Sequence, residues 1–284
     1  MLNAFLAVAD CGSFSLAAEK LFLTQPAVSK RIASLEGELG TPLFDRVGKR
    51  VILTEAGRVL LPRARHIVQE LVDSRRLIAN LSQEVGGTLQ FATSHHIGLH
   101  RLPGVLRDFT QQYPQVELDI RFTSSESACA MVAGGDIEMA VVTLPDDEFQ
   151  NLTIEKLWDD PMSLMVTRDH ALAMNSIDAQ RLSDYPAIFL KSETFTRRLI
   201  EKPLIALGVD IKTGLEINYL ETIRMLVSVG LGWSVLPLSM RTKELRIVEV
   251  KQIHFQRELG VVTHYARTRS KAAYAFLELL RAAA

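Results

Sequence analysis

The sequence predicts a multidomain chain that combines an all-helical N-terminal part carrying a small β-ribbon with an α/β C-terminal part. Three observations support this fold class. The chain has 284 residues, which is more than one ordinary domain holds. Short amphipathic helices fill the first sixty positions, and apolar strands alternate with helices from about position 88. The hydrophobic fraction of 48% is enough to build a core in each part.

Charge is distributed unevenly along the chain. The net charge of the whole chain is only -1, but residues 20–65 contain nine Lys or Arg and four acidic residues, so this segment carries +5. A basic segment on an otherwise acidic chain favours a polyanionic partner for that segment alone.

Two short helices are predicted first. Residues 2–9 are apolar helix formers, and Cys11 with Gly12 ends the run. Ser13 or Ser15 can cap a second helix over 15–22, whose alanines permit close approach of a neighbouring helix.

A third helix is predicted over 25–40, with Thr24 as its N-cap and Pro26 in its first turn. One face carries an apolar stripe at helical spacing: Val28, Ile32, Leu35 and Leu39. The opposite face is short-chained, polar and basic near its start. Two short helices with such a face are typical of a helix-turn-helix that enters a DNA major groove, although a small helical bundle with a solvated face fits this periodicity too.

The next segment favours a winged helix-turn-helix. LFDRVGKRVILTEAG, from Leu43 to Gly57, predicts a strand, a turn at Gly48-Lys49, a second strand, and a helix capped by Thr54. Basic side chains at the tip of such a ribbon can reach phosphates or the minor groove. The predicted DNA-binding residues are Thr24, Gln25, Pro26, Ser29, Lys30, Arg31, Arg46, Lys49, Arg50 and Thr54.

These motifs resemble the LysR-type transcriptional regulators. The match is carried by F-x-x-V-A-x-x-G-S-F-S-x-A-A-x-x-L at 5–21, T-Q-P-A-V-S-K-R-I-x-x-L-E-x-E-L-G at 24–40, and P-L-F-D-R to L-T-E-A-G at 42–57. The resemblance implies that Gln25, Pro26, Ser29, Lys30 and Arg31 face DNA, with Arg46 and Thr54 near its backbone. It also implies a small-molecule effector and homotetramers as a common assembly.

A linker helix and hinge are predicted at 59–87, after a DNA-binding domain at 1–58. Positions on one face of this helix recur in alternating steps of four and three, the heptad spacing of helices that pair with each other. We call this face the seam; its positions are Leu60, Ala64, Ile67, Leu71, Ser74, Ile78, Leu81 and Val85. One long helix packed on its own domain is the alternative. Pairing would give a homodimer, whose two-fold symmetry suits a palindromic double-stranded DNA operator.

The third predicted domain, 88–284, is a two-lobed α/β effector-binding domain. Strands and helices alternate in two sets, with lobe I at about 88–161 and 267–284 and lobe II at about 162–266. The predicted strands are 88–93, 116–122, 137–143, 161–167, 186–190, 214–219, 233–237 and 260–266. Two such lobes joined by crossing strands are typical of periplasmic-type binding proteins, which hold a small ligand between the lobes.

Hydroxyl-bearing residues recur where the predicted strands end, and ligands of α/β lobes lie outside the carboxyl ends of strands. Each hydroxyl alone can be a helix cap, but their recurrence favours a polar or anionic effector. The predicted effector-binding residues are Ser94, His95, His96, Ser124, Ser125, Thr143, Thr194, Phe195, Thr196 and Thr222. Arg197 and Arg198 either pair with a ligand carboxylate or form a solvated helix face.

The three histidines of TSHHIGLH, His95, His96 and His100, raise the question of a metal site. Adjacent histidines point in different directions, and neither Cys nor a carboxylate lies nearby in sequence, so no metal and no cofactor is predicted. The sequence also contains no G-x-S-x-G, H-E-x-x-H or P-loop motif, so no catalytic residues are predicted and an enzyme is not expected. A binding protein with an incidental helical domain is a third possibility, which the wing argues against.

The leading prediction is therefore an effector-responsive transcriptional regulator, which is expected to contact RNA polymerase as well as DNA. Cys11 and Cys129 are far apart and fit packed thiols of a reducing compartment, with a redox role as the alternative. The opening residues lack the features of an export signal, and no apolar stretch is long enough to span a membrane. A soluble cytoplasmic protein is expected.

Overall fold

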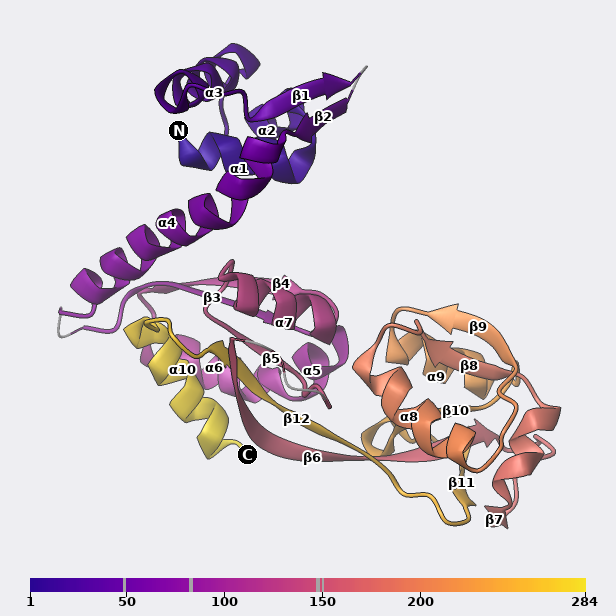
Figure 1. The fold of residues 1–284 in the computed structure, drawn as a ribbon. Coiled ribbons are helices and arrows are strands. Elements are labelled where there is room, and N and C mark those ends of the chain that lie inside the picture. Colours follow the sequence, from indigo (N-terminus) through magenta and orange to yellow (C-terminus); the bar gives the residue numbers. More distant parts are fainter. Residues whose placement is uncertain (48–49, 82–83, 147–148, 150) are drawn as a thin grey trace. The chain divides into compact units, whose positions relative to one another are not determined.

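The computed structural model describes residues 1–284 except 48–49, 82–83, 147–148 and 150, and the side chains of residues 46, 47, 50 and 79 also lie outside the description. The described residues form two compact units, Met1–Leu81 and Ser82–Ala284. Figure 1 shows helices and a two-stranded ribbon in the first unit, and a sheet with helices in the second. Both predicted structural classes are present.

Three helices begin the first unit: α1 (Leu2–Cys11), α2 (Phe14–Lys20) and α3 (Gln25–Leu39). The side chain of Ser13 accepts a hydrogen bond from the Leu16 amide, and the side chain of Thr24 accepts one from the Ala27 amide. These caps satisfy amides that a helix leaves unpaired at its start. Ser13 rather than Ser15 therefore caps α2, and the predicted cap of α3 is confirmed.

The buried face of α3 agrees with the predicted stripe except at its end. Val28, Ile32 and Leu35 are buried in the core that α3 shares with α1 and α2, but Leu39 is 48% exposed. Leu39 is the last residue of α3, and Gly40 follows in the left-handed conformation with φ of 67°. The prediction that Leu39 faces the core was wrong. The helix ends at Leu39, so this last position of the apolar stripe is not covered by the core.

A two-stranded ribbon follows α3. Strands β1 (Phe44–Val47) and β2 (Arg50–Leu53) pair antiparallel with Phe44 opposite Leu53. The Thr54 side chain caps the next helix, α4 (Glu55–Ala79), by accepting from the Gly57 amide. Leu81 and Val85, the last two positions of the predicted seam, lie beyond the end of this helix.

The second unit is built on one sheet of eight strands. The strand order is β4-β3-β5-β12-β6-β11-β7, with β10 pairing to β6, and β8 and β9 form a separate parallel pair. The strands are β3 (Gly87–Thr93), β4 (Val116–Phe122), β5 (Met139–Thr143), β6 (Leu152–Thr167), β7 (Ser176–Ile177), β8 (Ala187–Leu190), β9 (Thr213–Ile217), β10 (Ser234–Pro237), β11 (Leu245–Val250) and β12 (Phe255–His264).

The helices of the second unit divide between two lobes. The first lobe holds α5 (His95–His100), α6 (Leu102–Gln112), α7 (Ser125–Gly134) and α10 (Lys271–Ala282). The second lobe holds α8 (Phe195–Ala206), α9 (Leu220–Ser228), and 3₁₀ turns at Ala179–Asp184 and Leu238–Met240. In the first lobe, α6 and α10 pack on the sheet through Phe109 and Phe276, whose rings lie 5.3 Å apart edge to face.

Two long strands connect the lobes. Figure 1 shows β6 and β12 running together from the first lobe to the second. They pair antiparallel from His264 opposite Leu152 to Phe255 opposite Met162, with a register shift between Leu259 and Gly260. A Cβ atom on Gly260 would lie 2.1 Å from the Glu155 carbonyl oxygen, so only glycine fits this crossing.

Several elements of the second unit differ from the prediction. Strand β6 begins at Leu152, nine positions before the strand predicted at 161. The prediction missed its first half because that half is partly exposed and carries charged residues between apolar ones. Helix α5, strand β7 and strand β11 were not predicted. Within the described ranges of the chain, no helix is both long enough and apolar enough to cross a bilayer.

Candidate functional site

A cavity of about 450 Å³ lies between the two lobes of the second unit. Five strand ends meet it: β3 ends before Ser94, β4 before Thr123, β5 at Thr143, β8 before Lys191, and β9 before Asn218. The strands within each lobe that end here are parallel, so their carboxyl ends share an edge. This volume lies within the range of small-molecule sites, and the position is where α/β folds bind ligands.

The structure brings most of the predicted effector residues together on this cavity. Eight of the ten predicted residues line it: Ser94, His95, His96, Ser124, Ser125, Thr143, Thr194 and Thr196. Phe195 does not line it, because its side chain packs in a hydrophobic cluster with Phe149, 5.9 Å away between ring centroids. Thr222 does not line it either, because α9 starts earlier, at Leu220, which places Thr222 inside the helix.

Several of these hydroxyls already have internal partners. Ser124 accepts from the Ser127 amide, and Ser125 accepts from the Thr143 amide, each at 3.1 Å. Thr194 caps α8 by accepting from the Arg197 amide. The capping role considered from the sequence therefore holds for Ser124 and Thr194, while Ser94 makes no side-chain cap at the start of α5.

Arg257 is the buried cation of the cavity. Its side chain on β12 lines the cavity and is only 3% exposed. Its Nε donates to Asp160 Oδ2 at 2.7 Å, and its Nη1 donates to Thr196 Oγ1 at 3.3 Å. Its Nη2 is buried and has no partner among the described residues. Burial lowers the pKa of Arg257 and Asp160 opposes that shift, but a guanidinium stays charged throughout the physiological range.

His96, also on the cavity wall, is buried and uncharged. Burial, and next the charge of Arg257, lower its pKa to about 4. A neutral imidazole with hydrogen on Nδ1 donates to Glu221 Oε1, 3.1 Å away. His95 is exposed, and its ring lies 5.0 Å from that of Tyr219. The two adjacent histidines thus differ in burial, as their different directions on α5 require.

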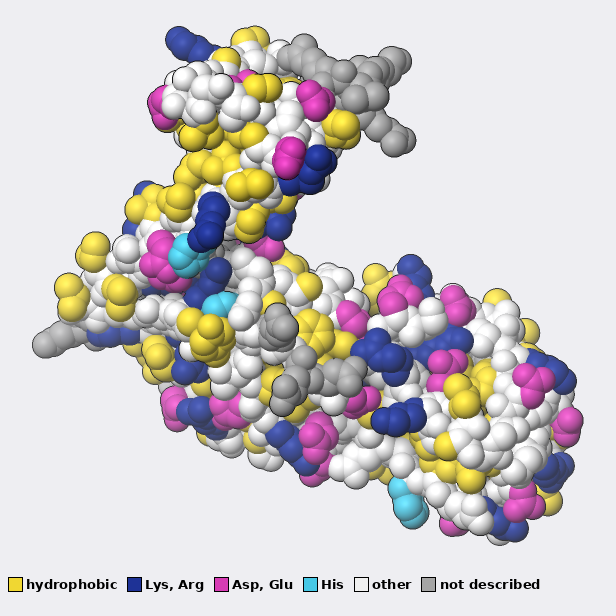
Figure 2. Space-filling model, in the orientation of Figure 1, with side chains coloured by type: hydrophobic (Ala, Val, Ile, Leu, Met, Phe, Trp, Pro, Cys, Tyr) yellow, Lys and Arg dark blue, Asp and Glu magenta, His cyan; other side chains and the backbone are white. Residues whose placement is uncertain are grey.

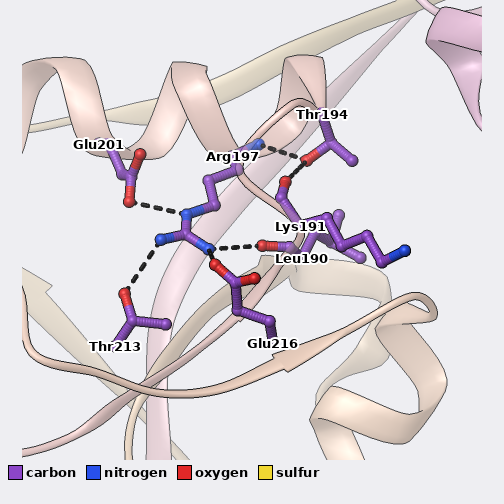
Figure 3. Close-up of polar contacts among 7 residues, drawn as sticks. All are labelled: Leu190, Lys191, Thr194, Arg197, Glu201, Thr213 and Glu216. Atoms are coloured by element: carbon purple, nitrogen blue, oxygen red, sulfur yellow. Dashed lines mark hydrogen bonds and ion pairs between the residues drawn. The ribbon is translucent and has the colours of Figure 1, made fainter.

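Arg197 is fully engaged inside the second lobe, as Figure 3 shows. Its Nε donates to Glu201 at 2.7 Å, its Nη1 donates to Glu216 at 2.6 Å and to the Leu190 carbonyl, and its Nη2 donates to Thr213. The sequence left open a ligand carboxylate or a solvated face for this residue. Neither applies to Arg197, because these contacts join α8 to β8 and β9.

The start of α3 presents the predicted DNA-reading residues of the first unit. Gln25, Pro26, Lys30 and Arg31 are exposed. Ser29 is half-buried and accepts a hydrogen bond from the Gln25 side chain at 2.9 Å. Pro26 and Lys30 lie on the face of α3 opposite its buried stripe, and Gln25, Ser29 and Arg31 flank that face.

Other predicted DNA-binding residues have structural roles or lie outside the description. The Thr54 hydroxyl donates to the Pro42 carbonyl and caps α4, and Thr24 caps α3. Arg46 and Arg50 belong to β1 and β2, but their side chains lie outside the described residues, as does Lys49 altogether.

Sequence reasoning missed Arg257, Glu221 and Asn218. Asn218 follows β9 directly, so the strand-end rule would have found it had the strand been predicted to end at Ile217. Arg257 occupies an inward position between Phe255 and Leu259 in an alternating strand, which is a detectable signal of a buried charge. Glu221 has no such signal, because its partner His96 lies 125 positions away.

Comparison with known proteins identifies both units. Residues 1–58 match the family model "Bacterial regulatory helix-turn-helix protein, lysR family", and residues 82–284 match "LysR substrate binding domain". A curated relative, the "Probable RuBisCO transcriptional regulator" of Synechocystis, is 33% identical over 97% of this chain and 83% of its own length.

Solved structures share the fold. A full-length OxyR variant of Pseudomonas aeruginosa aligns with a TM-score of 0.72 at 23% identity, over 99% of this chain and 93% of that one. The Synechocystis CcmR regulatory domain in complex with 2-PG aligns with a TM-score of 0.63 at 26% identity, over 69% of this chain and 96% of that domain.

Proposed function

Because this chain belongs to the LysR family, whose members are DNA-binding transcriptional regulators rather than enzymes, we propose that a small anionic effector in the cavity between the lobes controls its activity. The observation that carries this proposal is the unpartnered Nη2 of Arg257 on the cavity wall. A buried donor without a partner costs free energy, and a carboxylate or phosphate oxygen supplies the missing acceptor.

The rest of the wall suits the same class of ligand. Ser94 and Asn218 offer neutral hydrogen-bonding groups from opposite lobes, and Lys191 adds a second cation. Glu126 and Glu193 also line the cavity, so the favoured effector has an anionic group near Arg257 and hydroxyl or other donor groups elsewhere. The CcmR regulatory domain, solved with 2-PG, supports a small ligand in a domain of this fold.

The effector is tested by a thermal-shift screen of carboxylates and phosphates on the full chain. An effector raises the unfolding temperature because it binds only the folded protein. We expect Arg257→Met to abolish the shift given by the best ligand, and Ser94→Ala to reduce it. Arg198→Met is the matched control, because Arg198 does not line the cavity and donates to the Glu193 carbonyl.

Two outcomes would contradict the proposal. One is that no anion in the screen shifts unfolding of the wild-type chain. The other is a ligand whose shift survives both Arg257→Met and Ser94→Ala. Arg257→Met leaves Asp160 buried without its counter-ion, which can destabilise the fold by itself. Ser94→Ala therefore tests ligand binding in a chain whose buried ion pair is intact.

The assembly that we propose is a homodimer through α4, and a homotetramer by further association. Ile67, Leu71 and Ile78 lie on the predicted seam and are exposed. Figure 2 shows hydrophobic side chains recurring along α4. A run of exposed apolar side chains on a helix is typical of a surface that pairs with a second helix.

The dimer would present two copies of α3 to a palindromic operator, with the ribbon of β1 and β2 beside each copy. Closure of the lobes on the effector would change how the paired helices set the spacing of the two DNA-reading heads, which requires an assembly with two stable states. RNA polymerase is the expected further partner, in the cytoplasm. Footprinting on a selected operator with and without effector tests this step, and an unchanged footprint would contradict it.

A further inference from the structure

Two histidines of the first lobe and a glutamate of the second lobe converge at one point beside the cavity. His96 and His100 lie one turn apart on α5, and Glu221 lies on α9. Each offers one ligand atom, and the three atoms lie within 4.8 Å of one another. The rings of His96 and His100 are neighbours, with centroids 4.5 Å apart. The carboxylate that the histidine-rich segment lacks in sequence is therefore supplied by the other lobe.

Both imidazoles face the same carboxylate oxygen. Glu221 Oε1 lies 3.1 Å from His96 Nδ1 and 3.4 Å from His100 Nε2. Zinc bonds of about 2.0–2.1 Å in tetrahedral geometry place two ligand atoms about 3.3 Å apart. Two of the three separations thus already have the required length. The third, between the two imidazole nitrogens, is no more than 4.8 Å, and the His100 side chain is 39% exposed.

A second observation at Glu221 points independently to a cation. Its Oε2 atom is buried and has no hydrogen-bond partner within the described part of the chain. Buried carboxylate oxygens are almost always satisfied, because an unsatisfied one loses its hydration without replacement. A metal ion bound to this carboxylate would compensate for that loss.

The nearby charges leave room for a divalent ion. Arg257 acts electrostatically on both His96 and Glu221, and it opposes a cation there. Asp160 offsets that charge by accepting from Arg257 at 2.7 Å and from Arg101 at 3.3 Å. With Glu221, two carboxylates balance the two arginines before the ion binds. The further negative charge comes from the anion in the cavity, so this step rests on the proposed function.

We propose that His96, His100 and Glu221 bind a divalent transition metal ion of the zinc class, which joins α5 of one lobe to α9 of the other. Two imidazoles and one carboxylate are a typical zinc ligand set with a fourth position open to water or another ligand. Imidazole ligands favour zinc and its transition-metal neighbours over magnesium and calcium. The ion is distinct from the anionic effector and stabilises the arrangement in which the lobes are in contact.

The test is a titration of the full, chelator-treated chain with Zn²⁺, followed by calorimetry, and with Co²⁺, followed by visible absorption. We expect one saturable ion per chain and the absorption bands of cobalt in a histidine and carboxylate environment. Loss of a residue that only orients a metal ligand lowers metal affinity about 10–100-fold. His100 and Glu221 would bind the ion directly, so His100→Ala and Glu221→Gln should each lower the affinity about 100-fold or more.

His254→Ala is the matched control, because His254 is an exposed histidine that lies neither in the cluster nor on the cavity wall, so its loss should leave the affinity unchanged. His100 is partly exposed, so His100→Ala should keep the wild-type unfolding temperature without metal and lose only the increase that Zn²⁺ produces. The proposal is overturned if the wild-type chain binds no ion saturably, or if His100→Ala and Glu221→Gln bind as the wild type does.

Discussion

Arg257 Nε donates to Asp160 Oδ2 across 2.7 Å, and the two side chains are only 3% and 2% exposed. Arg257 lies on β12 and Asp160 on β6, so a buried ion pair joins the two strands that connect the lobes. The pair holds the guanidinium on the cavity wall while Nη2 stays available for a ligand.

Breaking this pair should destabilise the second unit strongly. Asp160→Asn leaves the Arg257 charge buried without its counter-ion, and such a change costs about 3–5 kcal/mol. Lys156→Ala is the control, because Lys156 pairs with Glu258 and Asp159 on the surface, where water screens the charges and the loss of stability should be far smaller. Denaturant unfolding of both variants measures the difference. Equal losses of stability would show that the Arg257–Asp160 pair is not desolvated as described.

Lys30 should contribute to DNA binding through phosphate charge. Lys30→Ala is expected to weaken binding to a duplex selected from random-sequence DNA, and to reduce the slope of log affinity against log salt by about 0.9. Lys202→Ala, which removes an exposed cation of α8 in the second unit, is the control and should leave the slope unchanged. Fluorescence anisotropy at several salt concentrations measures both quantities. A slope unaltered by Lys30→Ala would exclude this lysine from the interface.

The seam on α4 should determine the oligomeric state. Leu71 lies on the seam and is 54% exposed, so Leu71→Asp should place charge in the paired surface and reduce the solution mass of the assembly. Leu77 is almost equally exposed, at 55%, but lies off the seam. Leu77→Asp should therefore keep the wild-type mass in light scattering. If the two variants behave alike, α4 does not pair through the predicted face.

Cys129 should be chemically inert in the folded protein. Burial, and next the charge of Glu126, raise the pKa of its thiol to about 12, so almost none is thiolate at neutral pH. Alkylation followed by mass spectrometry should label the partly exposed Cys11 first, and Cys129 only after denaturant is added.

The same shift gives a pH dependence of stability. The folded pKa of Cys129 exceeds the ordinary value of 9.0, so the unfolded chain loses this proton first as pH rises. Stability from this group is complete below about pH 9 and falls above it. A Cys129→Ala variant should lack this alkaline component. Labelling of Cys129 in the native chain at the rate of Cys11 would contradict both expectations.

Local signals predicted the first unit well. The sequence predicted two helix starts from Thr24 and Thr54, whose hydroxyls cap α3 and α4 in the structure. It also predicted the buried face of α3 from the spacing of Val28, Ile32 and Leu35. Each of these features depends on residues within a few positions of one another, which is the range that sequence periodicity reports.

Features that depend on distant residues could not be predicted in the same way. The strand-end rule placed Ser94 and Thr143 on the cavity, because parallel strands bring their carboxyl ends together whatever the side chains are. The crossing of β6 and β12 brings the cation Arg257 to face these residues. The contact between the lobes brings the carboxylate of Glu221 to His96. Arg257 and Glu221 were therefore missed.

The route of the chain into the second lobe has an evolutionary consequence. Met162 on the outgoing strand lies opposite Phe255 on the returning strand, and both belong to the core of the second lobe, so the chain enters and leaves that lobe at neighbouring points. A segment whose ends are adjacent can be exchanged as a cassette without breaking the recipient's core. A recombination event that replaced residues 168–254 would substitute the second lobe's side of the cavity wall in one step, while Arg257 stayed with the recipient. The second lobe's side of the cavity could thus change as one unit while the DNA-binding unit and the first lobe keep their own cores.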